Sequence, residues 1–191
     1  IIQFVYLSAS EYAIGIPSEE KWLSKGIGEI RSVLGYPGIL LPSRKVHFIV
    51  LVGFESERAE KLITAYEPAV ISLGFGKAEQ SISQKHHEVN VVFHTMLSQK
   101  YVNVNLFTFS CINPLETSDF ILKQVSKFPE YNVVLAAMNT KISTIGAALA
   151  AFNNDTIQLC YAHAHQYNFD KYSSPGNDCY LFELPLFAQL K

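Results

Sequence analysis

Residues 131–152, YNVVLAAMNTKISTIGAALAAF, contain the strongest indication of the fold. In the expected strand, residues 132–137, a continuous apolar run with two adjacent valines follows Asn132, which is typical of a strand buried on both faces. The polarity changes at Asn139, and an Ala-rich apolar segment follows at residues 145–152. This order predicts a buried strand, a short polar turn and an apolar helix in direct succession, as in an α/β fold.

The polar turn carries amide, hydroxyl and lysine side chains, namely Asn139, Thr140, Lys141, Ser143 and Thr144. A helix N-terminus presents free backbone N–H groups and the positive end of the helix dipole, so it attracts anions. Ser and Thr are also preferred N-cap residues, so the same residues fit a plain helix start. The lysine favours the anion, because a cation in the first helical turn opposes the dipole. An anion site and a simple cap both stay open as hypotheses.

The composition fits a well-packed globular domain. The chain has 191 residues, of which 49% are hydrophobic and 17% charged, and this excludes disorder. Its 15 basic and 17 acidic residues give a formal net charge of −2, which predicts no bulk binding of DNA or RNA. No apolar run reaches the ~20 residues of a membrane span, and we expect a cytoplasmic protein without membrane contact. The three cysteines lack metal-site spacing, so each is expected to be a small buried hydrophobe.

The N-terminal part of the chain is expected to stand apart from the rest. Residues 1–8 favour a buried strand, and residues 18–34 favour a helix that starts with two early glutamates, although Gly26 and Gly28 weaken it. The chain does not begin with Met, so we expect a preceding segment in the protein. These patterns divide the chain into residues 1–45, a strand and helix that are the remnant of a preceding domain, and residues 46–191, the main domain.

Strands and helices alternate from residue 46 onward. The expected strands are residues 46–54, 69–76, 101–110, 132–137 and 155–165, and the expected helices are residues 55–66, 86–97, 113–128 and 145–152. Thr117 and Ser118 are the candidate caps of the third helix. Residues 179–187 favour a final antiparallel edge strand. The alternation predicts a Rossmann-like three-layer α/β/α sandwich with a mostly parallel sheet.

Right-handed crossovers place every strand-to-helix loop at the carboxyl edge of such a sheet, where ligands bind. The candidate ligand-binding residues in these loops are Glu55, Arg58, Lys77, Asn139, Thr140, Lys141, Ser143, His163 and Tyr167. The three basic side chains among them would favour an anionic ligand. The sequence therefore predicts an anionic small molecule or a nucleotide at this edge.

Several signatures of known chemistry are missing from these loops. The chain has no GxGxxG, no GxxxxGK[ST] and no GxSxG motif, so we predict no nicotinamide cofactor, no P-loop and no nucleophile elbow. His163 and His165 share one strand face, a spacing that suits a divalent metal, but a clear third ligand is missing. We therefore predict neither a cofactor nor a metal. His86 and His87 are expected to face solvent at a helix start.

The order of motifs over residues 46–165 resembles CARF domains, the CRISPR-associated Rossmann fold sensors of cyclic oligonucleotides. In that family a strand ends in an Asn-x-Thr-Gly-Gly-Thr-Lys turn that contacts the phosphates of the ligand. The stretch LAAMNTKISTIGAALA places Thr140 and Lys141 at the Thr-Lys positions, with Met138 and Asn139 in place of the two glycines. The chain also resembles Rossmann-type domains of bacterial proteins, which imply no particular activity.

Three function hypotheses follow from these observations. The first is a ligand-sensing or nucleotide-binding domain that forms a homodimer or acts with a preceding N-terminal domain. The second is a nucleotide-processing hydrolase or transferase that uses Glu55 or His163 as acid or base. The third is an interaction module, in which the first strand and residues 181–187 pair with another domain or subunit. The sequence favours the first, because it lacks a complete catalytic constellation, and it leaves open whether the chain is an enzyme.

Overall fold

The computed structural model describes residues 2–12, 22–170 and 172–184. They belong to two compact units, one of residues 25–166 and one of the segments before and after this range. The larger unit holds a six-stranded sheet, and the smaller unit holds a long two-stranded ribbon. Within the described residues, no helix is both long and apolar enough to cross a membrane.

The sheet of the larger unit is doubly wound. Its strands are β3 (Ile30–Pro37), β4 (Val46–Leu51), β5 (Val70–Gly76), β6 (Val104–Phe109), β7 (Asn132–Ala137) and β8 (Ile157–Ala162). They lie in the order β3-β8-β7-β4-β5-β6, and all neighbours are parallel except β3, which is antiparallel to β8. The chain order therefore reverses between β4 and β7, as at the switch point of Rossmann folds.

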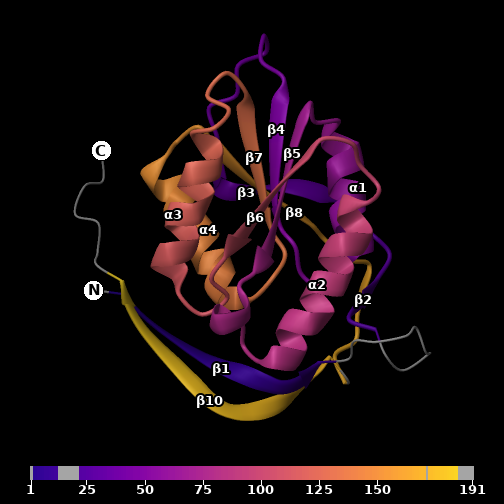
Figure 1. Cartoon of the computed structure of the whole chain (residues 1–191), viewed down its shortest axis with the longest axis vertical. Coiled ribbons are helices and arrows are strands. Elements are labelled where there is room, and N and C mark those ends of the chain that lie inside the picture. Colours follow the sequence, from indigo (N-terminus) through magenta and orange to yellow (C-terminus); the bar gives the residue numbers. More distant parts are fainter. Residues whose placement is uncertain (1, 13–21, 171, 185–191) are drawn as a thin grey trace. The chain divides into compact units, whose positions relative to one another are not determined.

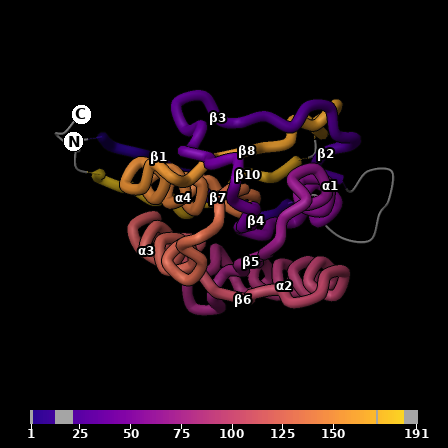
Figure 2. The backbone as a smooth tube through the Cα atoms, turned by 90° about the horizontal axis from the view of Figure 1, so that it is seen from above, coloured from indigo at the N-terminus to yellow at the C-terminus, as the bar shows by residue number. Residues whose placement is uncertain are grey.

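Helices cover both faces of this sheet (Figures 1 and 2). They are α1 (Ser56–Tyr66), α2 (Gln84–Ser98), α3 (Pro114–Val125) and α4 (Lys141–Asn153), with a short 3-10 helix at Ala78–Gln80. Along β4, Ile49 and Leu51 pack with side chains of α3 and α4, whereas Phe48 and Val50 pack with side chains of α1 and α2. Both faces of the apolar strands are thus buried, and the predicted three-layer Rossmann-like sandwich is confirmed.

The N-cap of α3 differs from the prediction. Thr117 and Ser118 are buried inside the helix, and the cap is Asn113, whose side chain accepts hydrogen bonds from the N–H groups of Leu115 and Glu116. Pro114 occupies the first helical position, where its missing N–H costs nothing. The Asn-Pro pair therefore starts the helix within the predicted range, about one turn before the predicted caps.

The helix predicted at residues 18–34 is wrong wherever the structure describes that range. Residues 18–21 lie outside the described residues, and residues 22–34 contain β2 (Ser24–Lys25) and the first part of β3. Gly26 has a left-handed backbone with φ of +67°, which interrupts a helix. Strand pairing at residues 30–32, against residues 160–162 of β8, overrides the helical spacing of the apolar side chains. Residues 25–45, expected in a separate N-terminal segment, lie in the same unit as the sheet.

The ribbon of the smaller unit joins the two ends of the described chain. β1 (Ile2–Tyr12) pairs antiparallel with β10 (Ser173–Leu184), and residues 185–187 of the predicted final strand lie outside the described residues. The final strand is antiparallel as predicted, its partner is β1, and β3 is the antiparallel edge of the six-stranded sheet. A further short strand pair joins β2 and β9 (Gln166–Tyr167).

Candidate functional site

The two loops at the switch point are in direct backbone contact. Gly53 follows β4 and Met138 follows β7, and a Cβ added to Gly53 would overlap the carbonyl oxygen of Met138. Only glycine permits this close approach. The contact fixes the starts of α1 and α4 on either side of the point where the strand order reverses.

Two asparagines hold the same loops. The side-chain amides of Asn139 and Asn90 both donate to the carbonyl oxygen of Val52, at 2.6 Å and 2.7 Å. The Asn90 Oδ1 also accepts a hydrogen bond of 3.1 Å from the N–H of Gly76, at the end of β5. Asn90 is fully buried on α2. The two amides thus continue the hydrogen bonding of the sheet beyond the strand ends, since buried backbone groups need partners.

Sequence reasoning missed Asn90, although one signal could have found it. The position lies four residues before His94 and seven before Leu97, so it shares the buried face of α2 with both. An amide on a helix face that meets the sheet must find a buried hydrogen-bond partner.

The hydroxyl groups of the predicted site are used within the protein. Thr140 is the N-cap of α4, and its Oγ1 accepts a hydrogen bond of 3.1 Å from the N–H of Ser143. The same hydroxyl donates to the carbonyl oxygen of Cys111 at 3.0 Å. The Ser143 hydroxyl donates to the carbonyl oxygen of Thr140 at 2.8 Å, and both side chains are buried. The cap hypothesis is confirmed for Thr140. The two buried hydroxyls hold the turn in its conformation through hydrogen bonds to the backbone.

Lys141 is the exposed cation of this turn. It is the first residue of α4, and no described residue forms a hydrogen bond or an ion pair with its side chain. The backbone N–H groups of Lys141 and Ile142 likewise have no acceptor among the described residues. Free N–H groups and a lysine at a helix N-terminus are the donors that an anion requires.

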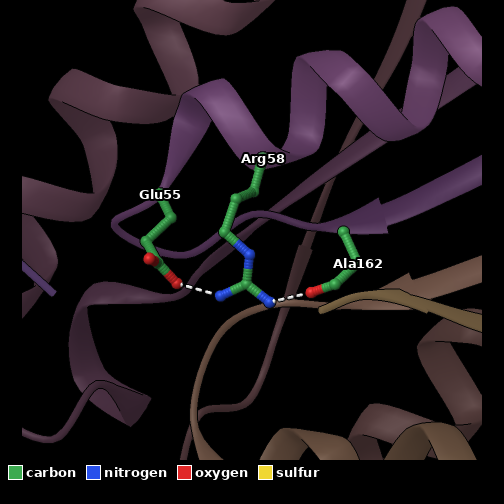
Figure 3. Close-up of polar contacts among 3 residues, drawn as sticks. All are labelled: Glu55, Arg58 and Ala162. Atoms are coloured by element: carbon green, nitrogen blue, oxygen red, sulfur yellow. Dashed lines mark hydrogen bonds and ion pairs between the residues drawn. The ribbon is translucent and has the colours of Figure 1, made fainter. Parts of the chain in front are cut away.

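Arg58 and Glu55 form a second polar contact at the same edge (Figure 3). The guanidinium of Arg58 forms an ion pair with Glu55 and donates to the carbonyl oxygen of Ala162, at the end of β8. These bonds tie the start of α1 to the end of β8. The charge of Arg58 is neutralised in place, and the ion pair favours a positioning role for Glu55 over acid–base chemistry.

The remaining candidates are spread over different surroundings. The ammonium group of Lys77 lies 4.2 Å from the ring centroid of Phe120 on α3, a cation–π contact. His163 is exposed just after β8, and its N–H donates to the carbonyl oxygen of Glu29. Tyr167 belongs to the smaller unit, where its ring packs against Phe169. The structure therefore gathers Asn139 to Ser143 at the switch point and gives Lys77 a partner on α3.

The cysteines and histidines provide no reactive cluster in the described part of the chain. Burial raises the pKa of Cys111 and of Cys160 to about 12, so both thiols are neutral buried groups, as predicted, whereas Cys179 is exposed.

His86 is buried, contrary to the prediction, because its ring packs against Phe54 with centroids 4.8 Å apart. Burial, followed by the charge of His87, lowers the pKa of His86 to about 4. No group of three or more His, Cys, Asp or Glu side chains among the described residues could hold a metal ion.

No protein-family model matches this chain, and a search of curated proteins finds no match either. The resemblance to CARF domains therefore stays a prediction that depends on the turn at residues 138–141.

Proposed function

We propose that this chain is a ligand-binding domain that takes an anionic ligand, and specifically a nucleotide, at the switch point between β4 and β7. One observation carries the proposal. The exposed Lys141 and the free N–H groups of Lys141 and Ile142 lie at the start of α4, next to the reversal of strand order. An anion bound there would accept hydrogen bonds from both N–H groups and would offset the repulsion between the lysine and the helix dipole.

A nucleotide is favoured over a simple anion by the architecture. Doubly wound sheets bind mononucleotides and dinucleotides across the switch point, with phosphate groups at a helix N-terminus. In the proposed role Lys141 contacts a phosphate, and Asn139 and Gly53 hold the turn in shape. Arg58 and Glu55 then act as positioning residues, because their charges are already paired.

Thermal unfolding against a panel of nucleotides, dinucleotides and cyclic oligonucleotides tests this proposal. A ligand at ~100 times its dissociation constant stabilises the folded chain by about 2.7 kcal/mol, which raises Tm by roughly 5–10 °C in a chain of this size. We expect Lys141→Ala to abolish the shift. Lys85→Ala is the matched control, since Lys85 is also exposed in the first turn of a helix, α2. An unchanged shift in Lys141→Ala, or an equal loss in Lys85→Ala, would contradict the proposal.

A second candidate is the interaction module, which the ribbon supports. Val5 and Leu181 are directly opposite each other on β1 and β10, and they are 72% and 62% exposed. Leu7, two residues along the same face, is also exposed. A protein partner that covers this exposed apolar face would stabilise the ribbon. Self-association that Leu181→Lys abolishes would support this role.

A further inference from the structure

The six-stranded sheet has two edges, β3 and β6, and they differ in chemistry. Among the residues that the structure describes, each edge strand pairs with a neighbour on one side only. The unpaired backbone N–H and C=O groups on the other side form a template for a further strand. Edge strands that must not pair with a further strand therefore carry charges, prolines or irregular pairing.

The β3 edge carries several of these protections. Arg31 and the exposed Glu29 form an ion pair on it. The pairing of β3 with β8 shifts register between Ser32 and Pro37, and Pro37 has no N–H to donate. Gly35 has a left-handed backbone with φ of +87°, which bends the strand between these positions. A second strand cannot add to this edge in regular register.

The β6 edge carries none of them. Its sequence, VNLFTF, has no charged residue, no proline and no glycine. Its register with β5 is regular along the whole strand. No strand among the described residues pairs with its outer side, and Leu106, at its centre, is 52% exposed. This edge is therefore regular, uncharged and partly apolar, the properties that favour pairing with another strand.

We propose that β6 is a homodimer interface, in which the strand pairs antiparallel with β6 of a second copy to form one continuous sheet. A two-fold axis brings the same edge against itself, so the lengths of the two strands match. The lack of charge on β6 removes like-charge repulsion between the copies. The protected β3 edge explains why association stops at two copies and does not continue into a fibre.

Sedimentation velocity over a series from about 1 μM to about 1 mM tests the proposal, because this range covers weak and moderate dissociation constants. We expect a monomer–dimer equilibrium in the parent chain. Leu106→Lys should raise the dimer dissociation constant by at least about tenfold, because each copy would place a charge at the centre of the interface. Leu34→Lys is the matched control: Leu34 is 99% exposed on the other edge strand, β3, and its substitution should leave the equilibrium unchanged.

Hydrogen exchange provides a second readout at the same site. Amides of residues 104–109 should be more protected in the dimer than in the diluted monomer, and this difference should vanish in Leu106→Lys. Because Leu106 is half exposed, the variant should keep the circular dichroism spectrum of the parent. A parent that stays monomeric throughout, or a dimer unaffected by Leu106→Lys, would overturn the proposal. A dimer that Leu181→Lys disrupts instead would assign association to the ribbon and would also overturn it.

Discussion

Two polar clusters lie at opposite ends of the same sheet, and they are built differently. At the amino end, the Nε2 of His47 on β4 lies 2.7 Å from the hydroxyl of Ser72 on β5. The amide of Asn105 on β6 donates to this hydroxyl and to the Oε1 of Gln124 on α3, which also accepts from Lys127. Here side chains bind side chains across three strands and a helix.

At the carboxyl end, two asparagine side chains bind the backbone instead. Asn90 and Asn139 hold the carbonyl oxygen of Val52, while the N–H groups of Lys141 and Ile142 stay free. The amino-end cluster uses its polar groups to join elements, so it serves stability. The carboxyl-end cluster fixes a turn and leaves donors at its surface, which is the arrangement that binding requires. Substitutions at the two ends should therefore have different consequences.

The largest effect should come from Gly53→Ala at the carboxyl end. The added Cβ would overlap the carbonyl oxygen of Met138, so the two loops must separate. We expect the free energy of unfolding to fall by about 3–5 kcal/mol, or folding to fail, as measured by urea denaturation.

Gly35→Ala is the control for this substitution. Gly35 has a positive φ but open space around its Cβ position, so alanine there costs only the strain of a left-handed backbone, about 1 kcal/mol. Equal losses in the two variants would show that contact between the switch-point loops does not hold the turn in place.

At the amino end, His47 should make the chain sensitive to acid. Burial, followed by the charge of Lys127, lowers its pKa from 6.5 to about 4, and its Nδ1 has no partner among the described residues. The unfolded chain then binds a proton more readily than the folded chain between pH 6.5 and pH 4. The contribution of His47 is therefore fully present above pH 6.5 and is lost as the pH falls toward 4, by about 3 kcal/mol at most.

Urea denaturation of the parent and of His47→Gln at several pH values measures how much His47 contributes to the pH dependence of the free energy of unfolding. The glutamine amide does not titrate, so the variant should lose less stability between pH 6.5 and pH 4 than the parent. His86→Gln is the control, because it removes another histidine of lowered pKa and keeps His47. Identical pH profiles in the parent and His47→Gln would show that the amino-end cluster is not the source of the acid sensitivity.

The sequence predicted the sheet well because its signal is periodic. Continuous apolar runs such as residues 133–137 occur where both faces are covered, and the alternation with helices then leaves few topologies. The same reasoning failed at residues 22–34, where apolar spacing fitted a helix but pairing with β8 produced a strand. Local spacing does not report a partner that lies more than 120 residues along the chain.

The site was predicted less well, because the position of a residue in a loop does not give the direction of its side chain. Arg58 and Lys77 follow strand ends as expected, yet one is paired with Glu55 and the other lies over Phe120. The direction of each side chain, and so its partner, is decided by the packing of the folded chain. Lys141 is exposed, because it occupies the first position of a helix whose cap is the preceding residue.

The smallest effect, from Thr140→Ala, separates the shape of the carboxyl-end turn from its chemistry. The substitution removes the N-cap of α4 and the donor to Cys111, so the free energy of unfolding should fall by about 1–2 kcal/mol. Thr144→Ala is the control, because the only partner of the Thr144 hydroxyl in the described part of the chain is the carbonyl oxygen of Thr140, so its loss should cost less. If Thr140 only shapes the turn and does not contact the ligand, a nucleotide should raise the free energy of unfolding of Thr140→Ala by about as much as it does in the parent. Lys141→Ala, in contrast, should unfold with the stability of the parent but should gain no stability from the nucleotide. The opposite pattern, with binding lost in Thr140→Ala and kept in Lys141→Ala, would show that the Thr140 hydroxyl contacts the ligand and that Lys141 does not.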